Sequence, residues 1–257
     1  MKILRILNFI ALIATITING LANTLPINGM LTGEVSDSFQ ALFTPAGYVF
    51  AIWGLIYLAL TAFAVYQILP SQKENSRIER IGIWFILANL FNGAWIFAWH
   101  YLQFVLSLVF MLGLLVSLIA IYLRLGIGIS KTNPKDRWFL EVPFSIYLGW
   151  ISVATIANVS VVLLDLNWTG FGVSETVWTI IMLVIGTILG LLITYLRSEV
   201  FYTLVLIWAF IGITQNGSGD VLVTTMAWAA AIVLVIFLII ARTIIRRKQL
   251  IERYKPS

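Results

Sequence analysis

The sequence predicts an all-α fold, a polytopic transmembrane helical bundle of about eight helices with both termini cytoplasmic. Three observations predict it. The chain is 61% hydrophobic and only 11% charged, whereas a soluble domain carries about 25% charged residues. Apolar runs separated by short polar breaks recur along the whole chain. The Lys and Arg residues fall only in alternate breaks, which is the pattern that orients membrane proteins.

The apolar runs define the expected helices, because a helix needs about 17 to 25 apolar residues to cross a bilayer. The first run follows Lys2 and Arg5, as a signal peptide would. It has no A-x-A cleavage site and is longer than a signal core, so we expect an uncleaved helix. The seventh run is the weakest span, since it is short and ends in the polar residues 214–218. The eight runs are residues 3–22, 47–69, 81–99, 102–123, 139–164, 176–196, 200–213 and 221–245.

All sixteen basic residues lie at the two ends of the chain or in the segments 70–80, 124–138 and 197–199. These segments are therefore expected in the cytoplasm, with the basic C-terminal tail against lipid headgroups and the chain in the cell membrane. The pI near 9.6 does not indicate nucleic acid, because no polar domain carries the charge. The opposite breaks carry only acidic charges, on Glu34, Asp37, Asp165, Glu175 and Asp220.

Few residues offer chemistry, so we predict neither an enzyme nor a required cofactor. The chain has no cysteine and one histidine, which makes a structural zinc site improbable. His100 lies in a short turn and is expected to be solvated, with an axial haem or proton-sensing role as the alternative. Glu141 lies four residues after Arg137, which favours an ion pair between them. The runs show no buried acidic pair or central base that would couple ions.

Residues 147–158 carry the most informative helix stripe. Tyr147, Trp150, Ala154 and Asn158 lie at offsets 0, 3, 7 and 11, on one helix face. Lipid offers no partner for an amide, so Asn158 should face other helices or a cavity. Trp150 lies too deep in its run for an interfacial role, which is the expected role of Trp84, Trp99, Trp138, Trp168 and Trp178.

Two further runs carry related stripes. The second has Phe50, Trp53 and Tyr57, and the third has Asn89, Asn92 and Trp95. If the three stripes converge, they form an aromatic pocket for a flat apolar ligand, oriented by amide and phenol groups. Aromatic packing between helices is the alternative. The turn-rich first loop, residues 23–44, is either a lid over this pocket or a flexible connector.

These stripes resemble the TspO/MBR family, the tryptophan-rich sensory proteins related to the mitochondrial translocator protein. The motif of the family's second helix corresponds to Thr44-Pro45-Ala46-Gly47-Tyr48-Val49-Phe50, with Trp53 and Tyr57. The motif of its third helix corresponds to Asn89, Asn92 and Trp95. The motif of its fifth helix corresponds to Tyr147, Trp150, Ala154, Thr155 and Asn158. The resemblance covers residues 1–168. Its departures are a single proline at Pro45, a shorter Phe50-to-Trp53 spacing, a proline moved to Pro143, and three extra helices.

The resemblance implies a membrane sensor or receptor that binds a tetrapyrrole (porphyrin or haem) or a sterol-like molecule. We therefore expect a five-helix membrane domain at 1–168 and a three-helix segment at 169–257. A homodimer is a further expectation, and Gly186-x-x-x-Gly190 fits a close helix contact. The alternative function is a secondary transporter or permease component for a small apolar or amphipathic solute, for which the polar residues 214–218 are the one candidate feature.

Overall fold

The computed structural model describes residues 2–39 and 41–253, and within these ranges it contains helices, turns and loops but no strand. All eight predicted runs form helices. The eight long helices are α1 (Lys2–Ala22), α3 (Ile52–Ile68) with its leading 3-10 turn η1 (Gly47–Ala51), α5 (Trp84–His100), α6 (Phe104–Leu125), α8 (Val142–Asp165), α9 (Glu175–Arg197), α10 (Phe201–Ile213) and α11 (Val221–Arg253). The short elements are α2 (Thr32–Asp37), η2 (Pro70–Gln72), α4 (Ser76–Ile81), α7 (Pro134–Asp136), the π-helical turn η3 (Arg137–Glu141) and η4 (Gly170–Gly172).

In the described part of the chain, six helical segments are long and apolar enough to cross a membrane. The other two long helices are shorter: α5 has 17 residues and α10 has 13. The third run begins later than predicted, because Gly82 adopts a φ of +58° that interrupts the helix between α4 and α5. The chain is a multi-pass membrane protein, and the cytoplasmic placement of its termini stays a prediction. The basic tail's side chains lie outside the described residues from residue 245 onward.

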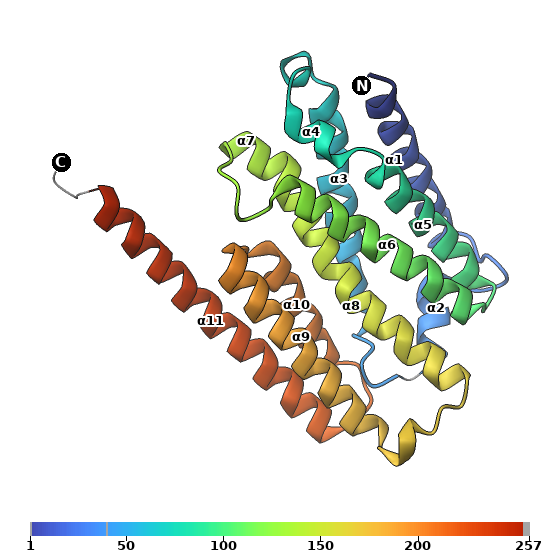
Figure 1. Cartoon of the computed structure of the whole chain (residues 1–257). Helices are drawn as coiled ribbons and strands as arrows, with labels where there is room; N and C mark the ends of the chain where they lie inside the picture. The colour runs from blue at the N-terminus through green and yellow to red at the C-terminus, as the bar shows by residue number, and fades with distance from the viewer. Residues whose placement is uncertain (1, 40, 254–257) are drawn as a thin grey trace.

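Helix α8 is the centre of the bundle and packs against α3, α6 and α10. Every side chain from Val142 to Ile151 is buried, which explains why this run is apolar on all sides. Figure 1 shows α9, α10 and α11 side by side along one flank, next to α8. The last three helices therefore pack directly onto the first five.

Glycines bring this flank close to the rest of the bundle. A Cβ on Gly149 would lie 3.0 Å from the carbonyl oxygen of Tyr202, so glycine lets α8 approach the backbone of α10. Cβ atoms on Gly186 and Gly190 would lie 2.9 Å from the ring of Phe210 and 2.8 Å from Leu234. The predicted close helix contact is therefore real, but it joins helices of the same chain. Both glycines are buried there, so they offer no face to a second copy.

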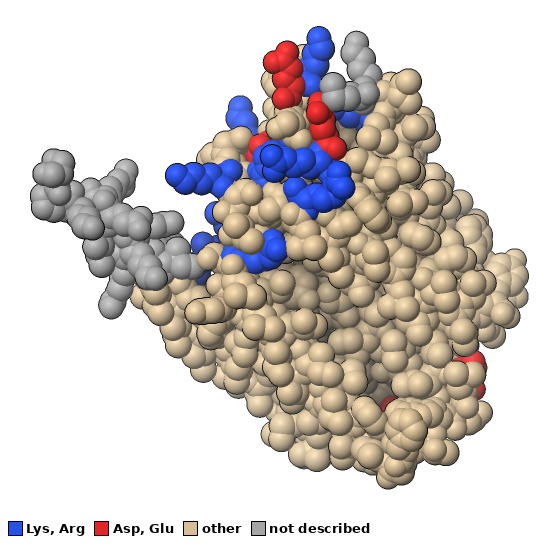
Figure 2. All heavy atoms as spheres, viewed as in Figure 1, with Lys and Arg blue, Asp and Glu red and all other residues tan. Residues whose placement is uncertain are grey.

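The two ends of the bundle differ in charge. We call the end formed by residues 70–81, 124–141 and 197–200 the charged end, and the end formed by 23–46, 166–174 and 214–220 the loop end. On the face drawn in Figure 2, Lys and Arg gather at the charged end, where Figure 1 places α4 and α7. The segregation predicted from the sequence is thus a property of the folded molecule.

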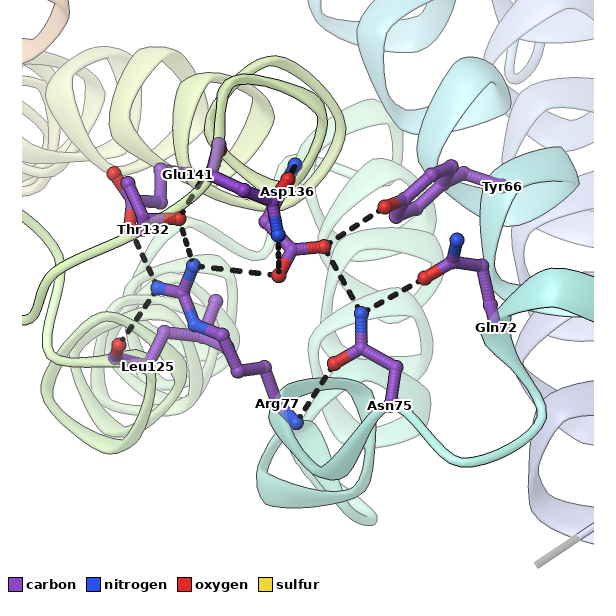
Figure 3. Close-up of polar contacts among 9 residues, drawn as sticks. Tyr66, Gln72, Asn75, Arg77, Leu125, Thr132, Asp136 and Glu141 are labelled. Carbon is purple, nitrogen blue, oxygen red and sulfur yellow. Dashed lines mark hydrogen bonds and ion pairs between the residues drawn. The ribbon is translucent and has the colours of Figure 1, made fainter.

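A buried ionic cluster joins α4, α7 and η3 at the charged end (Figure 3). The Arg77 guanidinium donates to Glu141 Oε1 at 2.5 Å and to the carbonyl oxygen of Leu125 at 3.1 Å, and it also contacts Thr132. It lies 3.8 Å from Asp136 Oδ2. Asp136 Oδ1 also accepts hydrogen bonds from Tyr66 Oη at 2.8 Å and Asn75 Nδ2 at 2.9 Å.

The predicted pairing of Glu141 with Arg137 is wrong. Glu141 pairs with Arg77 instead, which is 64 residues away in sequence. The reason is local: residues 137–141 form a π-helical turn in which the N–H of Val142 bonds the carbonyl of Arg137. In this wider turn, residues four apart do not stack as they do in an α-helix. Glu141 is buried and faces α4.

Candidate ligand-binding site

A cavity of about 500 Å³ lies at the loop end between α1, α3, α5 and α8, with the first loop across it. Its volume is in the range of small-molecule sites. Seven of the ten residues predicted from the stripes line it: Phe50, Trp53, Tyr57, Trp95, Trp150, Ala154 and Asn158. The second, third and fifth predicted runs therefore converge on one hollow.

Aromatic rings form one wall of the cavity. The indole of Trp53 meets that of Trp150 edge-on with ring centres 6.2 Å apart, and it stacks on Tyr57 at 5.4 Å. Phe50 contacts Trp150 edge-on at 5.6 Å. These rings bring α3 and α8 together, and they present flat apolar surface beside the cavity.

A hydrogen-bond chain joins two further residues of the lining, Trp95 and Asn158, to α6. Trp95 Nε1 donates to Asn158 Oδ1 at 3.0 Å, and Asn158 Nδ2 donates to Ser107 Oγ at 3.0 Å. The chain links α5, α8 and α6, as expected for an amide that cannot face lipid. Trp95 also stacks on Trp99, with ring centres 5.5 Å apart. Trp99 is buried and lines the cavity, so its expected interfacial role is wrong.

Asn89, Asn92 and Tyr147, the remaining predicted residues, are not among the cavity lining. Asn92 lies behind the wall, where its Nδ2 donates to Tyr147 Oη at 3.0 Å and its Oδ1 accepts from Asn19 Nδ2 at 2.7 Å. The side chain of Asn89 donates to the carbonyl of Phe85, one turn earlier in α5. Asn92 and Tyr147 have partners in neighbouring helices and Asn89 has one in its own helix, so these groups support the wall rather than form it.

Sequence reasoning missed lining residues from α1 and the first loop. In α1 a signal was present, because Asn19 interrupts an apolar run and a buried amide needs a partner. The loop residues carried no periodic signal. The missed polar residues that line the cavity are Asn19, Asn23, Thr32, Ser36, Asp37 and Thr44.

Three polar atoms in the cavity lining are buried without a hydrogen-bond partner: Trp150 Nε1, Tyr57 Oη and Thr44 Oγ1. Trp150 is only 1% exposed. Nearly all buried polar groups in folded proteins have partners, and an unsatisfied one is costly. Two of these atoms, on Trp150 and Tyr57, belong to side chains that the sequence stripes place in the pocket.

The first loop is held at α5 by His100, whose predicted solvation is wrong. The imidazole is fully buried. Its Nδ1 lies 2.9 Å from the carbonyl oxygen of Ile96 and therefore donates, and its Nε2 lies 3.2 Å from Thr32 Oγ1. Asn28 Nδ2 donates to the carbonyl oxygen of His100 at 3.0 Å. The ring is buried because the loop folds back over the end of α5, which the turn sequence alone did not reveal.

Helices α9 and α10 hold the other end of the loop. The N–H of Leu42 donates to Glu175 Oε1 at 2.9 Å, and the carbonyl oxygen of Leu42 accepts from Asn216 Nδ2 at 2.9 Å. The N–H of Ala46 donates to the carbonyl of Gly212 at 3.1 Å. The loop is thus attached to both the first five and the last three long helices, which is more than a flexible connector requires.

Compared with known proteins, the chain matches one family model. This model is described as TSPO-like protein and matches residues 5–240. This stretch extends past residue 168, the limit of the resemblance in the sequence, and includes α9, α10 and most of α11. No curated protein and no solved structure matches the chain. Since the family model covers most of its length, this chain belongs to the family of TSPO-like proteins.

Proposed function

We propose that this protein is a sensor or receptor of the cell membrane that binds a planar hydrophobic ligand, tetrapyrrole-like or sterol-like, in the cavity between α3, α5 and α8. One observation carries the proposal: a cavity of about 500 Å³ is lined by the indoles of Trp53, Trp95, Trp99 and Trp150. Stacking on these rings would supply most of the affinity. Amide side chains in the lining, those of Asn19, Asn23 and Asn158, would help to orient the ligand.

Membership of the TSPO-like family supports a binding role, and we assign the protein no catalytic role. In the described residues, no group of three or more His, Cys, Asp or Glu side chains is arranged to hold a metal ion. The cavity lining offers a single carboxylate, Asp37, and no imidazole. An acid–base pair of the kind that hydrolysis or isomerisation requires is therefore not formed by these residues.

We propose binding in preference to transport. The transport alternative rested on the polar residues 214–218, which lie beyond the C-terminal end of α10 at the loop end. There Asn216 bonds to the first loop. Many transporters bind solute at a break in the middle of a membrane helix. Residues 214–218 follow the end of a helix and do not form such a break.

A fluorescence titration tests the proposal. The purified protein in a neutral detergent is titrated with dehydroergosterol, a fluorescent sterol, and with a porphyrin, and quenching of tryptophan emission is followed. We expect saturable quenching by at least one probe, with affinity reduced about tenfold or more in Trp53→Ala. The matched control is Trp228→Ala, which removes a half-exposed indole of α11 outside the cavity. Equal affinity in the two variants would refute the site.

A further inference from the structure

The cavity has a one-sided charge environment. Asp37 is the charged residue in its lining. The stretches that supply the lining carry no Lys or Arg at all: the sequence has none between Arg5 and Lys73, between Arg80 and Arg124, or between Arg137 and Arg197. On the face drawn in Figure 2, the loop end shows acidic atoms and no basic ones.

A second, polar hollow of about 640 Å³ continues the cavity outward. The two share the loop residues Ser36, Asp37 and Thr44, as well as Pro45 and Gly47. The outer hollow adds a second carboxylate, Glu175, and the amides of Gln215 and Asn216. A ligand that fills the aromatic cavity would therefore place its outer end beside two carboxylates.

This arrangement bears on the charge of the ligand. Free porphyrins such as protoporphyrin IX, and haem, carry two ionised propionates. A carboxylate that leaves water needs a cation or several donors to replace its hydration, and a neighbouring carboxylate repels it. The lining offers isolated hydroxyl, amide and indole groups but no guanidinium or ammonium group. A dianionic ligand therefore finds no oppositely charged partner here. An uncharged ligand has no ionic hydration to replace, and a cationic ligand is attracted by the two carboxylates.

Resting on the proposed function, we propose that the cavity selects planar amphipathic ligands that are uncharged or cationic at their polar end, and that it discriminates against dianionic tetrapyrroles. The determinant is the carboxylate of Asp37 together with that of Glu175. Sterols and esterified or amine-bearing ring systems satisfy this rule, and free porphyrin dicarboxylates do not.

A pair of probes that differ only in charge tests this. Protoporphyrin IX and its dimethyl ester share one ring system, and esterification removes both negative charges. At pH 7.5 and low salt in a neutral detergent, we expect the diester to bind about tenfold or more tightly than the diacid. Added salt should reduce the ratio of the diester affinity to the diacid affinity, because Asp37 is exposed and salt screens its charge.

Variants separate charge from the greater hydrophobicity of the diester. Asp37→Asn should reduce the preference for the diester over the diacid several-fold. Asp37→Lys should reduce this preference further, because the diacid should bind more tightly to a site that carries a positive charge. The control is Asp165→Asn, an exposed carboxylate at the loop end that lines neither hollow. The inference is overturned if the diacid binds as tightly as the diester, or if both Asp37 variants leave the ratio unchanged. If neither porphyrin nor the fluorescent sterol binds saturably, the proposed function itself fails.

Discussion

The charged end and the loop end of the bundle differ in how completely their buried polar groups are paired. At the charged end, Arg77 lies between Glu141 and Asp136, and Asp136 has further donors in Tyr66 and Asn75, so that only Arg77 Nε lacks a partner in this cluster. At the loop end, Trp150 Nε1 and Tyr57 Oη, on side chains that line the cavity, are buried and have no hydrogen-bond partner. Both regions were visible in the sequence as polar residues near apolar runs.

A buried polar residue therefore indicates a binding site only where its side chain lines a cavity and its hydrogen-bond partners are missing. Where most partners are present, as for the terminal nitrogens of Arg77, the group belongs to the architecture. This separation predicts that substitutions of partnered polar groups lower stability, whereas substitutions of unpartnered groups in the cavity lining weaken ligand binding and those in the loop attachments change loop motion. The following experiments test this contrast, in order of decreasing expected effect.

Glu141→Ala should produce the largest loss of stability. It leaves the largely buried Arg77 side chain, 12% exposed, without its closest carboxylate, and breaking a buried pair in this way costs at most about 3–5 kcal/mol. Thermal unfolding in detergent measures the effect. Glu79→Ala is the control, because Glu79 is an exposed acid on the same short helix α4 as Arg77. A Glu141 variant as stable as the control would show that the cluster is not architectural.

Two tryptophan-to-phenylalanine variants compare a partnered indole with an unpartnered one. Trp95→Phe removes the shorter of two bonds to Asn158 Oδ1 and leaves only the 3.3 Å bond from Ser107 Oγ, so we expect a loss of about 1–3 kcal/mol in unfolding free energy. Trp150→Phe removes a donor that has no partner, and we expect a smaller loss but weaker binding of the ligand. Unfolding and titration of both variants give the comparison. The reverse order of stability would contradict the assignment of partners.

Asn216→Ala should loosen the first loop without unfolding the bundle. The side chain donates to the carbonyl oxygen of Leu42, and loss of one such bond costs about 1 kcal/mol. Hydrogen exchange of residues 32–44 should quicken about fivefold, whereas that of α8 stays unchanged. Gln215→Ala is the control, since Gln215 is the exposed neighbour in the same outer hollow. Equal exchange in both variants would mean that α10 does not hold the loop.

Glu199→Gln should give the smallest effect, and one that depends on pH. Burial raises the pKa of this carboxyl above its ordinary value of 4.5, although the N–H groups of Phe201 and Val200 oppose the shift. Because the folded state favours the protonated form, the stabilisation is full below pH 4.5 and is lost as pH rises through the folded pKa. The glutamine variant keeps an acceptor for both N–H groups. Its Tm should exceed that of the wild type by a few degrees, about 2–4 °C, at pH 7.5 and equal it near pH 4.

The sequence was sufficient for the features that depend on local spacing. Run length fixed the eight helices, and the helical period placed Trp53, Trp95 and Trp150 on faces that meet. Periodicity does not say which residue on a face adjoins open space, so Asn92 and Tyr147 were expected in the cavity but lie behind its wall.

Contacts between distant segments were beyond sequence reasoning. The partner of Glu141 depends on a π-helical turn and on α4. The burial of His100 depends on where the first loop folds, through Thr32 and Asn28. The attachment of that loop to α9 and α10 joins residues 133 and 174 positions apart. The division into domains at 168 and 169 stays a prediction.

Photoaffinity mapping shows whether a ligand binds in the cavity between α3, α5 and α8. The protein in lipid vesicles is irradiated with a sterol that carries a diazirine on its ring system, and labelled residues are identified by mass spectrometry with and without excess unlabelled sterol. We expect competable labelling on α3, α5 and α8 at residues lining the cavity, such as Trp53, Ala154 and Asn158. Competable labelling confined to the outward faces of α6 and α11, with none in the cavity, would contradict this expectation.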